Sequence, residues 1–374
     1  MATATTVGTV GTLYPSLPSL RFSSNFMLAK LTGFQHYSSV RASPYLPVGI
    51  QVVAAGMARI CLLVATRRGL LFLQKVAELL PDAHLTVFSF KEEEDEPPFL
   101  DNIRAFTTSV GGSFHIARNV GLSKYAKLWT EIAAGGLDLM FCVSWRYLVS
   151  AEIYKLPLRG TFVFHDSMLP RYRGFAPTVW AIVNGEQLTG VSLMAIADEV
   201  DSGDIIDQEA VHIRDTETIA SVIERTTEAY LRVLARNLGQ LLDGTFRTVP
   251  QEHDRATYTV KRTSLDNLIR WNATAKECFN LVRAITRPYP GAVTFLDGAK
   301  WIVWGADLAD TRRVEVKAPG RIVSFGPDGI SVLCGDGRLL RLTHLMDENG
   351  TELTGSDLLR PCFKLSSTFT SQFA

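Results

Sequence analysis

The chain has 374 residues, 47% of them hydrophobic, and its 38 basic side chains equal its 38 acidic ones. This length and apolar content suffice for one large core or two moderate ones, and chains of this size usually hold two domains. The zero net charge excludes a general electrostatic attraction of the whole chain to nucleic acid or membranes. Residues 261–374 are mildly basic, with 15 basic and 12 acidic side chains, which permits a polyanionic partner.

The cysteines and histidines indicate neither disulfides nor a metal site. Cys61, Cys142, Cys278, Cys334 and Cys362 are far apart, and no pair has CxxC spacing. We therefore expect buried thiols in a reducing compartment. The seven histidines form neither an HxxxH nor an HExxH pattern, so we predict no metal ligands.

Residues 1–57 differ in composition from the remainder of the chain. They contain no Asp or Glu, and Arg21, Lys30 and Arg41 make them basic. No apolar run among them is long enough to span a membrane. This composition is typical of an organellar transit peptide, for a chloroplast or a mitochondrion. An unstructured tail, or an extension upstream of a start at Met57, is the alternative.

Between residues 58 and 242, apolar runs of strand length alternate with helical patterns. The alternation predicts an α/β domain over residues 58–250 with a doubly wound, mostly parallel, Rossmann-like sheet. No GxGxxG motif follows the first strand, so we predict no dinucleotide site. The acidic run 92–96 predicts a solvated loop. The predicted strands are 58–66, 84–90, 137–143, 161–164 and 190–197. The predicted helices are 69–80, 123–134, 151–154, 176–184 and 216–242. Ser123 is the predicted N-cap of the second helix, and Thr216 and Gly244 are the predicted N-cap and stop of the last one.

After residue 250 the pattern changes to one helix, predicted over 272–285, and a series of short strands. Gly and Asp separate these strands, which predicts a small OB-like β-barrel over residues 271–374, joined by a linker at 251–270. The predicted strands are 292–296, 301–304, 321–325, 330–333 and 338–342.

Polar side chains follow the apolar strand 161–164 at once, as His165, Asp166 and Ser167. A loop rich in Pro and Gly comes next, so the backbone cannot run straight into a helix. In an open α/β sheet, ligands bind beyond the carboxyl ends of the strands. We therefore predict a ligand site here. Arg171 and Arg173 in this loop could bind phosphate or carboxylate, or could only solvate the loop.

Two further strand ends contribute to the predicted site. The aromatic run 144–147 follows the strand 137–143 and predicts a pocket wall, with a cap on the core as the alternative. Asp201 lies in an acidic turn, 36 residues after His165. A carboxylate beside a histidine fixes its tautomer and makes it a general base. A loop histidine bonded to backbone, and an aspartate that only caps a turn, are the alternatives.

The segments that carry these residues resemble formyltransferases that use 10-formyltetrahydrofolate. They are His165–Gly174 (HDSMLPRYRG), Asn184-Gly185-Glu186, Thr189-Gly190-Val191, Val200–Ile205 (VDSGDI) and Pro288–Ala292 (PYPGA). The resemblance covers about residues 58–364, and thus both predicted domains. It implies transfer of a formyl group to a primary amine, with 10-formyltetrahydrofolate as co-substrate, and implies no metal, membrane or protein partner.

The resemblance also implies roles for individual residues. His165 and Asp201 match the catalytic pair, in which the histidine takes the proton of the attacking amine and the aspartate orients it or a bound water. The implied folate pocket consists of Trp145, Arg146, Tyr147, Leu148, Phe164 and Val200. The implied substrate-binding loop contributes Asp166, Ser167, Arg171, Tyr172 and Arg173.

The chain departs from the family at Val163, where an asparagine is expected two residues before the histidine. The amide of that asparagine helps to hold the developing oxyanion, and valine cannot donate a hydrogen bond. Losing one such donor typically lowers the rate by about a hundred- to a thousandfold. One hypothesis is therefore that this chain is a catalytically impaired relative that binds folate or RNA.

The resemblance leaves two acceptors open. The transit-like N-terminus and the two-domain layout favour the amino group of initiator methionyl-tRNA in an organelle. The loop around His165 and the run 144–147 are more similar to amino-sugar N-formyltransferases, whose acceptor is a nucleotide-linked 4-amino sugar. We expect methionyl-tRNA to be the acceptor, and the amino sugar is the alternative.

Overall fold

The computed structural model describes residues 57–93, 96–121, 123–308, 313–315, 317–359, 363–365 and 367–371. The transit-peptide prediction for residues 1–57, apart from Met57 itself, and the prediction for Cys362 lie outside these ranges. Within the described residues, no helix is both long and apolar enough to cross a membrane.

The first region is built on a seven-stranded sheet with the order β3-β2-β1-β4-β5-β7-β8. The strands from β1 to β5 run parallel, whereas β7 is antiparallel to β5 and β8 is antiparallel to β7. This confirms the prediction of a doubly wound, mostly parallel sheet. The strands are β1 (Arg59–Val64), β2 (His84–Ser89), β3 (Ser113–Ile116), β4 (Leu139–Val143), β5 (Thr161–His165), β7 (Leu188–Ala195) and β8 (Ile205–His212).

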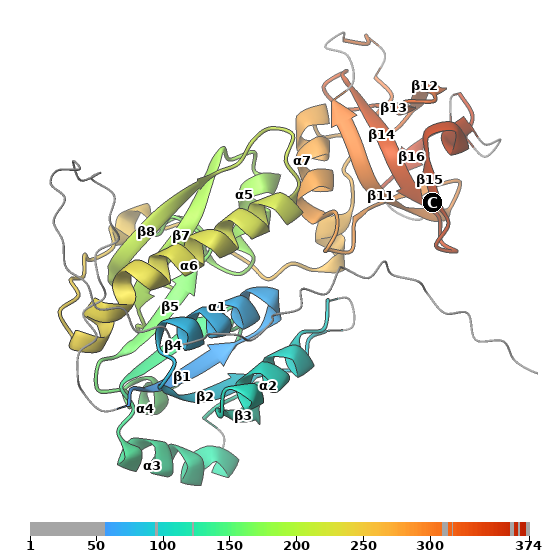
Figure 1. Ribbon diagram of the computed structural model, residues 1–374. Helices are drawn as coiled ribbons and strands as arrows, with labels where there is room; N and C mark the ends of the chain where they lie inside the picture. Colours follow the sequence, from blue (N-terminus) through green and yellow to red (C-terminus); the bar gives the residue numbers. More distant parts are fainter. Residues whose placement is uncertain are drawn as a thin grey trace, which may run out of the picture. The chain divides into compact units, whose positions relative to one another are not determined.

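Helices cover both faces of this sheet, as Figure 1 shows. On one face α1 (Thr66–Leu79), α2 (Leu100–Ser109) and α6 (Ile219–Asp243) bury Phe72, Ile103 and Tyr230 against the strands. On the other face lie α3 (Ala126–Gly135) and α4 (Ala151–Tyr154), which bury Trp129 and Ile153. Since strand side chains alternate between faces, β1, β2, β4 and β5 contribute side chains to both cores.

Several local predictions need correction. Ser123 does not cap α3, because residues 123–125 form a 3-10 turn and the helix begins after Tyr125. Thr218, not Thr216, is the N-cap of α6, since the Glu217 carboxylate accepts from the Arg214 N–H and keeps this segment in a turn. Gly244 ends α6 with a φ of 70°, as predicted.

The acidic run 92–96 was predicted to be solvated, but Glu92 is buried. Its carboxylate accepts a hydrogen bond of 2.9 Å from the Phe99 N–H, at the start of α2. Negative charge is favourable at the first N–H groups of a helix, which explains the burial. The helix α2 and the strand β3 themselves were missed by the sequence analysis.

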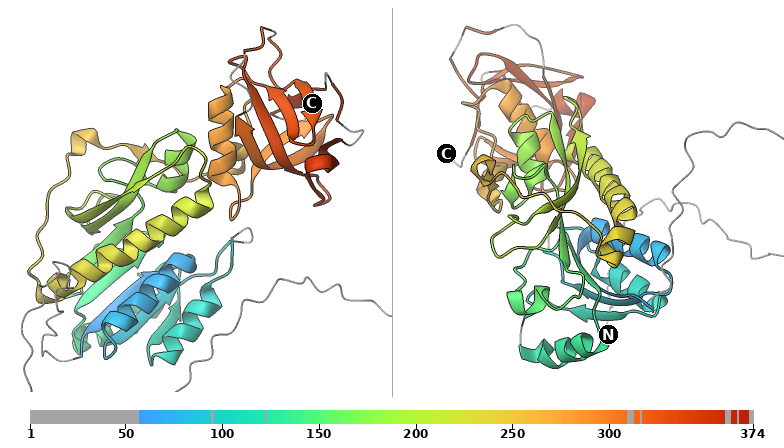
Figure 2. Two further views of the ribbon diagram at one scale, coloured as in Figure 1. Left: turned by 45° about the horizontal axis from the view of Figure 1, so that its top comes forward. Right: turned by 90° about the vertical axis from the view of Figure 1, so that its left-hand side faces the viewer.

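The second region contains one helix and a curled antiparallel sheet, visible in both views of Figure 2. The helix α7 (Ala275–Ile285) begins with a capping box between Thr274 and Glu277. A bridge between Arg321 and Thr368 draws the two edges of the sheet together, which supports the predicted OB-like curl. The sheet has the order β12-β13-β14-β11-β10-β16, with strands β10 (Ala292–Leu296), β11 (Ala299–Leu308), β12 (Ile322–Gly326), β13 (Gly329–Leu333), β14 (Leu339–Met346) and β16 (Phe369–Thr370), and with β15 (Glu352–Thr354) beside β14.

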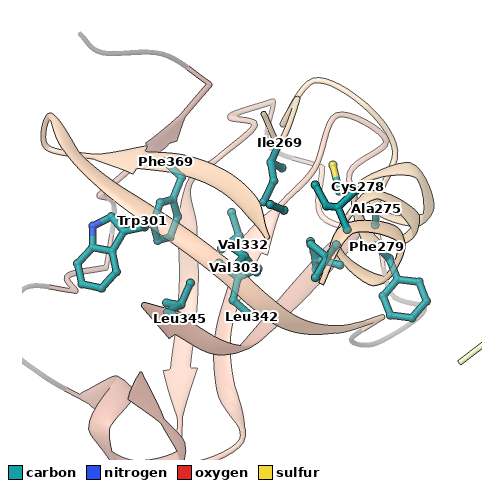
Figure 3. Packing of buried hydrophobic residues seen from close by; sticks show 14 of the residues in the cluster. Ile269, Ala275, Cys278, Phe279, Trp301, Val303, Val332, Leu342, Leu345 and Phe369 are labelled. Atoms are coloured by element: carbon teal, nitrogen blue, oxygen red, sulfur yellow. The ribbon is translucent and has the colours of Figure 1, made fainter. Parts of the chain in front are cut away.

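The core of this second region lies between α7 and the concave side of its sheet. Figure 3 shows Val303, Val332 and Leu342 of the strands grouped together, with Ala275 and Cys278 on the helix beside them. Four of the five cysteines, Cys61, Cys142, Cys278 and Cys334, are buried and free, as predicted.

Candidate active site

The strand β5 delivers His165 to the predicted crevice. Phe162 and Phe164 pack into the core on the α1 and α6 face, whereas Val163 packs on the opposite face. His165 follows the same alternation as Val163 and is 8% exposed. Its Nε2 lies 2.8 Å from the Tyr172 carbonyl oxygen, and its Nδ1 lies 3.5 Å from Oδ2 of Asp201. The structure thus brings together the two residues that the sequence analysis paired.

Asp201 is held in place by the backbone of the active-site loop. Its Oδ2 accepts a hydrogen bond of 2.7 Å from the Gly174 N–H. Its own backbone has a φ of 50°, a left-handed conformation that aspartate adopts more readily than most residues. The Tyr172 carbonyl and the Gly174 N–H therefore hold the histidine and the aspartate from the short strand β6 (Arg173–Gly174) and the residue that precedes it.

The two contacts of His165 differ in length. The Nε2 contact is a normal hydrogen bond, whereas 3.5 Å between Nδ1 and Asp201 exceeds the usual N–H···O range. Because a carbonyl oxygen can only accept, Nε2 carries the hydrogen of the neutral ring, and Nδ1 has the lone pair that can take a proton. The carboxylate beside it would stabilise the imidazolium that forms when it takes a proton.

Asp166 has a different environment from its neighbour His165. Its carboxylate forms a buried ion pair with Arg68 of α1 and accepts a hydrogen bond from the Tyr230 hydroxyl of α6. Burial would raise the pKa of Asp166, but the Arg68 guanidinium and the Tyr230 hydroxyl outweigh burial and lower it. Burial raises the pKa of Tyr230 and the Asp166 charge raises it further. Asp166 was predicted in the substrate-binding loop, but its side chain is saturated by protein groups.

The remaining residues of the predicted substrate loop also divide into buried and exposed ones. The Ser167 hydroxyl donates to the Arg171 carbonyl over 2.7 Å, and Arg173 is almost wholly buried at 1% exposure. Arg171 is exposed and ion-paired with Glu186, which also accepts from the Tyr172 hydroxyl over 2.8 Å. Arg171 is therefore the exposed cation among the loop's predicted substrate contacts.

An aromatic wall stands at the ends of β2 and β4. Trp145 and Tyr147 pack edge-on against each other and against Phe90. Arg146 pairs with Glu96 over 2.5 Å and lies over the Phe90 ring. The indole Nε1 of Trp145 is buried and finds no hydrogen-bond acceptor among the residues that the structure describes.

The other predicted folate contacts do not share one environment. Leu148 is 81% exposed and Val200 is 49% exposed, so both side chains are accessible. Phe164 is buried on the far face of the sheet, where it stacks on Tyr230. Phe164 therefore supports the site from beneath and is not placed to touch a ligand beside His165.

Val163 lies where the family resemblance places it, on the same face as His165 and two residues before it. Its partners across the strands are Cys142 of β4 and Met194 of β7. Burial raises the pKa of the Cys142 thiol to about 12, so it stays protonated at neutral pH and is at best a weak donor. Neither neighbouring side chain replaces an asparagine amide.

The sequence analysis missed Arg68, Tyr230, Phe90 and Gln251. Arg68 lies in the first turn of α1, where the helix dipole disfavours a cation. An arginine there, directly after a buried strand, was a signal that it has an anionic partner elsewhere. Phe90, Tyr230 and Gln251 carried no such local signal.

Two sequence families match the chain. Residues 86–238 match the formyl transferase family, and residues 262–362 match the formyl transferase C-terminal domain. This chain belongs to the formyl transferase family. It is therefore a formyltransferase, and the two matched segments lie in the α/β region and in the curled-sheet region.

Solved structures of formyltransferases have the same fold. WlaRD, a sugar 3N-formyltransferase crystallised with dTDP and 5-N-formyl-THF, is 17% identical with a TM-score of 0.58, over 79% of this chain and 100% of that chain. The N-formyltransferase from Helicobacter canadensis, in complex with folinic acid and dTDP-3-aminofucose, is 17% identical with a TM-score of 0.58, over 76% and 99%. HypX from Aquifex aeolicus in complex with tetrahydrofolic acid is 19% identical with a TM-score of 0.53, over 83% of this formyltransferase and 48% of HypX.

Among the described residues of the formyltransferase, no three His, Cys, Asp or Glu side chains gather as metal ligands would. A groove of about 410 Å³ lies beside the active-site loop. Residues 168–171 line one side of it, and residues 249–252 with Ile205 and Arg255 line the other. The groove is large enough for a sugar-sized group and carries two exposed arginines, Arg171 and Arg255.

Proposed function

We propose that this formyltransferase moves the formyl group of 10-formyltetrahydrofolate to the amino group of initiator methionyl-tRNA. The observation that carries the proposal is the contact between His165 and Asp201 at the carboxyl end of β5, in a chain with both formyl transferase domains. The pair lies where an open α/β sheet binds its ligands.

In the proposed reaction the acceptor amine attacks the formyl carbon. A bond forms between this carbon and the amine nitrogen, and the bond from the carbon to N10 of the folate breaks. Nδ1 of His165 takes a proton from the amine, Asp201 stabilises the imidazolium, and the proton passes to N10 of the leaving tetrahydrofolate. The net products are the N-formylated acceptor and tetrahydrofolate.

We place the folate against the aromatic wall of Trp145 and Tyr147, with Leu148 and Val200 at the mouth of the pocket. Flat ring systems pack well against aromatic side chains, and the exposed Leu148 and Val200 add apolar area for a ligand to cover. Two similar structures support folate chemistry on this fold, because their crystals contain formylated folates.

The acceptor is proposed from the chain's charge and layout. Residues 261–374 carry 15 basic and 12 acidic side chains, which is compatible with an RNA partner. Arg171 and Arg255 line the groove beside the loop and can face a phosphate of the acceptor. The composition of residues 1–57 supports an organelle as the place of action, where translation would start with formylmethionine.

A nucleotide-linked amino sugar is the second candidate acceptor. The observation that favours it is the similarity to WlaRD and to the Helicobacter canadensis enzyme over nearly the whole of those chains. A third candidate is a formyltransferase of low activity that chiefly binds folate or RNA. Val163, which puts an apolar side chain where an amide donor is expected, favours it.

One assay separates these three candidates. The purified chain is incubated with 10-formyltetrahydrofolate and either methionyl-tRNA or a nucleotide-linked 4-amino sugar, and the formylated product is measured. We expect turnover with methionyl-tRNA. Turnover with the sugar alone would overturn the leading proposal, and folate binding without turnover on either acceptor would favour the third candidate.

The proposed location has its own test. Residues 1–57 are fused to a fluorescent protein and the fusion is expressed in cells that contain the candidate organelles. We expect the signal in chloroplasts or mitochondria. A signal spread evenly through the cytosol would contradict the transit-peptide prediction.

A further inference from the structure

Arg173 is a buried cation with neutral partners. Its guanidinium donates to Oε1 of Gln251 over 2.7 and 3.1 Å and to the Tyr258 hydroxyl over 3.1 Å, and Nη2 lies 3.1 Å from Nδ1 of His253. Within the part of the chain that the structure describes, no carboxylate forms an ion pair with it. Burying a charge is costly unless its hydrogen bonds are satisfied, so this arrangement needs an explanation.

Gln251 connects Arg173 to the turn that carries Asp201. While Oε1 accepts from the guanidinium, Nε2 donates to the Asp201 carbonyl over 2.9 Å and to the Gly203 carbonyl over 2.6 Å. The buried amide cannot be turned over, because a flip would place its NH₂ group against the guanidinium and its oxygen against two carbonyls. Arg173 thus fixes the direction in which Gln251 donates.

These contacts close a circuit around His165. The loop residues on either side of Arg173 make the histidine and aspartate contacts, through the Tyr172 carbonyl and the Gly174 N–H. The circuit therefore runs from His165 through residues 172–174 to Gln251, then through Asp201 back to Nδ1 of His165. The links through Gly174 and Gln251 are hydrogen bonds, whereas the closing link between Asp201 and Nδ1 is a contact of 3.5 Å.

The linker provides the hydrogen-bond partners of the Arg173 guanidinium. Gln251, His253 and Tyr258 all lie in the segment 251–270 that the sequence analysis treated as a connection between domains. The strand β9 (Tyr258–Thr259) pairs in parallel with β6, and the Arg173 N–H donates to the Thr257 carbonyl over 2.8 Å. At Gly174 a Cβ atom would come within 2.3 Å of the Thr259 carbonyl oxygen, so the two strands meet too closely for a side chain.

We propose that Gln251, oriented by Arg173, is a positioning residue for the His165–Asp201 pair, and that the linker is part of the active-site frame. The inference rests on the proposed roles of His165 and Asp201. In this arrangement Gln251 hydrogen-bonds neither to the His165 ring nor to the Asp201 carboxylate. By holding the backbone carbonyl of Asp201, Gln251 fixes the distance between the Asp201 carboxylate and Nδ1 of His165, at which the His165–Asp201 pair accepts a proton.

The test uses Gln251→Glu in the full-length chain. Glutamate keeps the size of the side chain and strengthens its contact with Arg173, but it loses the NH₂ group that holds the Asp201 and Gly203 carbonyls. The carboxylate gains an ion pair with Arg173 but repels the Asp201 and Gly203 carbonyls, so we expect unfolding at a somewhat lower denaturant concentration, a kcat lower by about 10- to 100-fold, and an unchanged KM for the folate. The pH profile of kcat should also move, and a shift in the uncharged Gln251→Asn variant as well would separate positioning from the effect of the added charge.

A second variant and a control accompany it. Gln251→Asn shortens the amide by one methylene group, so that it cannot span Arg173 and the Asp201 turn, and it should lower kcat in the same way. Gln240→Glu makes the same chemical change at an exposed position of α6 and should leave kcat and its pH profile unchanged. Wild-type kcat and pH profile in both Gln251 variants would overturn the inference.

A readout independent of turnover separates this inference from the proposed function. The pH titration of the His165 ring is followed by NMR, with the His165→Gln variant assigning its signal. We expect the midpoint to differ between the wild type and Gln251→Asn, which adds no charge of its own, even if no acceptor is formylated. An unchanged midpoint would overturn the positioning role, whereas an inactive wild type with a shifted midpoint would overturn only the proposed function.

Discussion

His165 and Asp166 are consecutive residues whose side chains belong to separate networks. The ring of His165 faces Asp201 and the Tyr172 carbonyl, whereas the carboxylate of Asp166 is buried between Arg68 and Tyr230. In the proposed function the first network exchanges protons with a ligand, whereas the second anchors the end of β5 to two helices. A change to either residue should therefore have a different consequence.

Replacing His165 or Asp201 by alanine should abolish most turnover without unfolding the protein. General acid–base groups typically contribute about 100- to 10,000-fold to a rate, so we expect kcat to fall by a factor in this range. Formyl transfer is measured by product formation, and folding by circular dichroism. Wild-type turnover in either variant would show that the site lies elsewhere.

Introducing the missing amide through Val163→Asn should raise kcat. The expected gain is at most about a hundred- to a thousandfold, the usual effect of one oxyanion donor. A modest loss of stability should accompany it, since Val163 packs against an apolar cluster that includes Trp145. Val163→Ala is the control, because it disturbs the same packing without adding a donor. Equal kcat for the asparagine and alanine variants would mean that another group already holds the oxyanion.

Trp145→Phe should weaken folate binding and lower the stability only by the packing area that the smaller ring loses. The buried Nε1 of Trp145 has no partner, so its removal costs the fold no hydrogen bond. If this N–H donates to bound folate, affinity should fall by about 10-fold, as measured by titration calorimetry with a formylated folate. Trp129→Phe is the matched control, because its Nε1 donates to the Val120 carbonyl over 2.7 Å and its loss should destabilise the fold. Unchanged affinity in Trp145→Phe would exclude the indole from the folate site.

Asp166→Asn should destabilise the protein strongly. The change leaves the Arg68 guanidinium buried without its anion, which typically costs about 3–5 kcal/mol. Urea denaturation measures the change in the free energy of unfolding. Glu131→Gln, which removes an exposed ion pair with Lys127, should have little effect. A stability of Asp166→Asn close to the wild-type value would mean that Arg68 finds another partner.

Protonation of Asp166 should account for part of the stability that the protein loses in acid. The pKa of this carboxyl is below its ordinary value of 3.8 in the folded protein, so the unfolded chain binds a proton first as the pH falls. The stabilisation is therefore present above about pH 4 and is lost as the pH drops through the folded-state pKa. Melting temperatures at several pH values between 7 and 2 measure this. The difference between the wild type and Asp166→Asn should shrink in acid, and a constant difference would contradict the linkage.

The regular elements followed from local patterns wherever burial was complete. The strands β4 and β5 are continuous apolar runs covered on both faces, and the helix α4 has the predicted bounds. The edge strand β3 was missed because its side chains are only partly buried and show no apolar run. The helix α2 was missed because no polar N-cap marks its start after Phe99.

The candidate site was only partly visible in the sequence. The abrupt change from apolar to polar at His165 and the acidic turn at Asp201 marked two strand ends, and the carboxyl ends of neighbouring strands meet at one edge of a sheet. Gln251 could not be found this way, because its partners lie 78 and 50 residues away along the chain.

The sequence by itself determined where polar side chains follow the buried strands, since such a break in an apolar run is local. Only the tertiary structure decided which of those side chains face a ligand. His165 and Asp166 differ by one step of the strand alternation, and that step sends one ring towards Asp201 and one carboxylate towards Arg68. Because Arg68 and Asp201 come from distant segments, the choice between a crevice and a buried ion pair is made by packing.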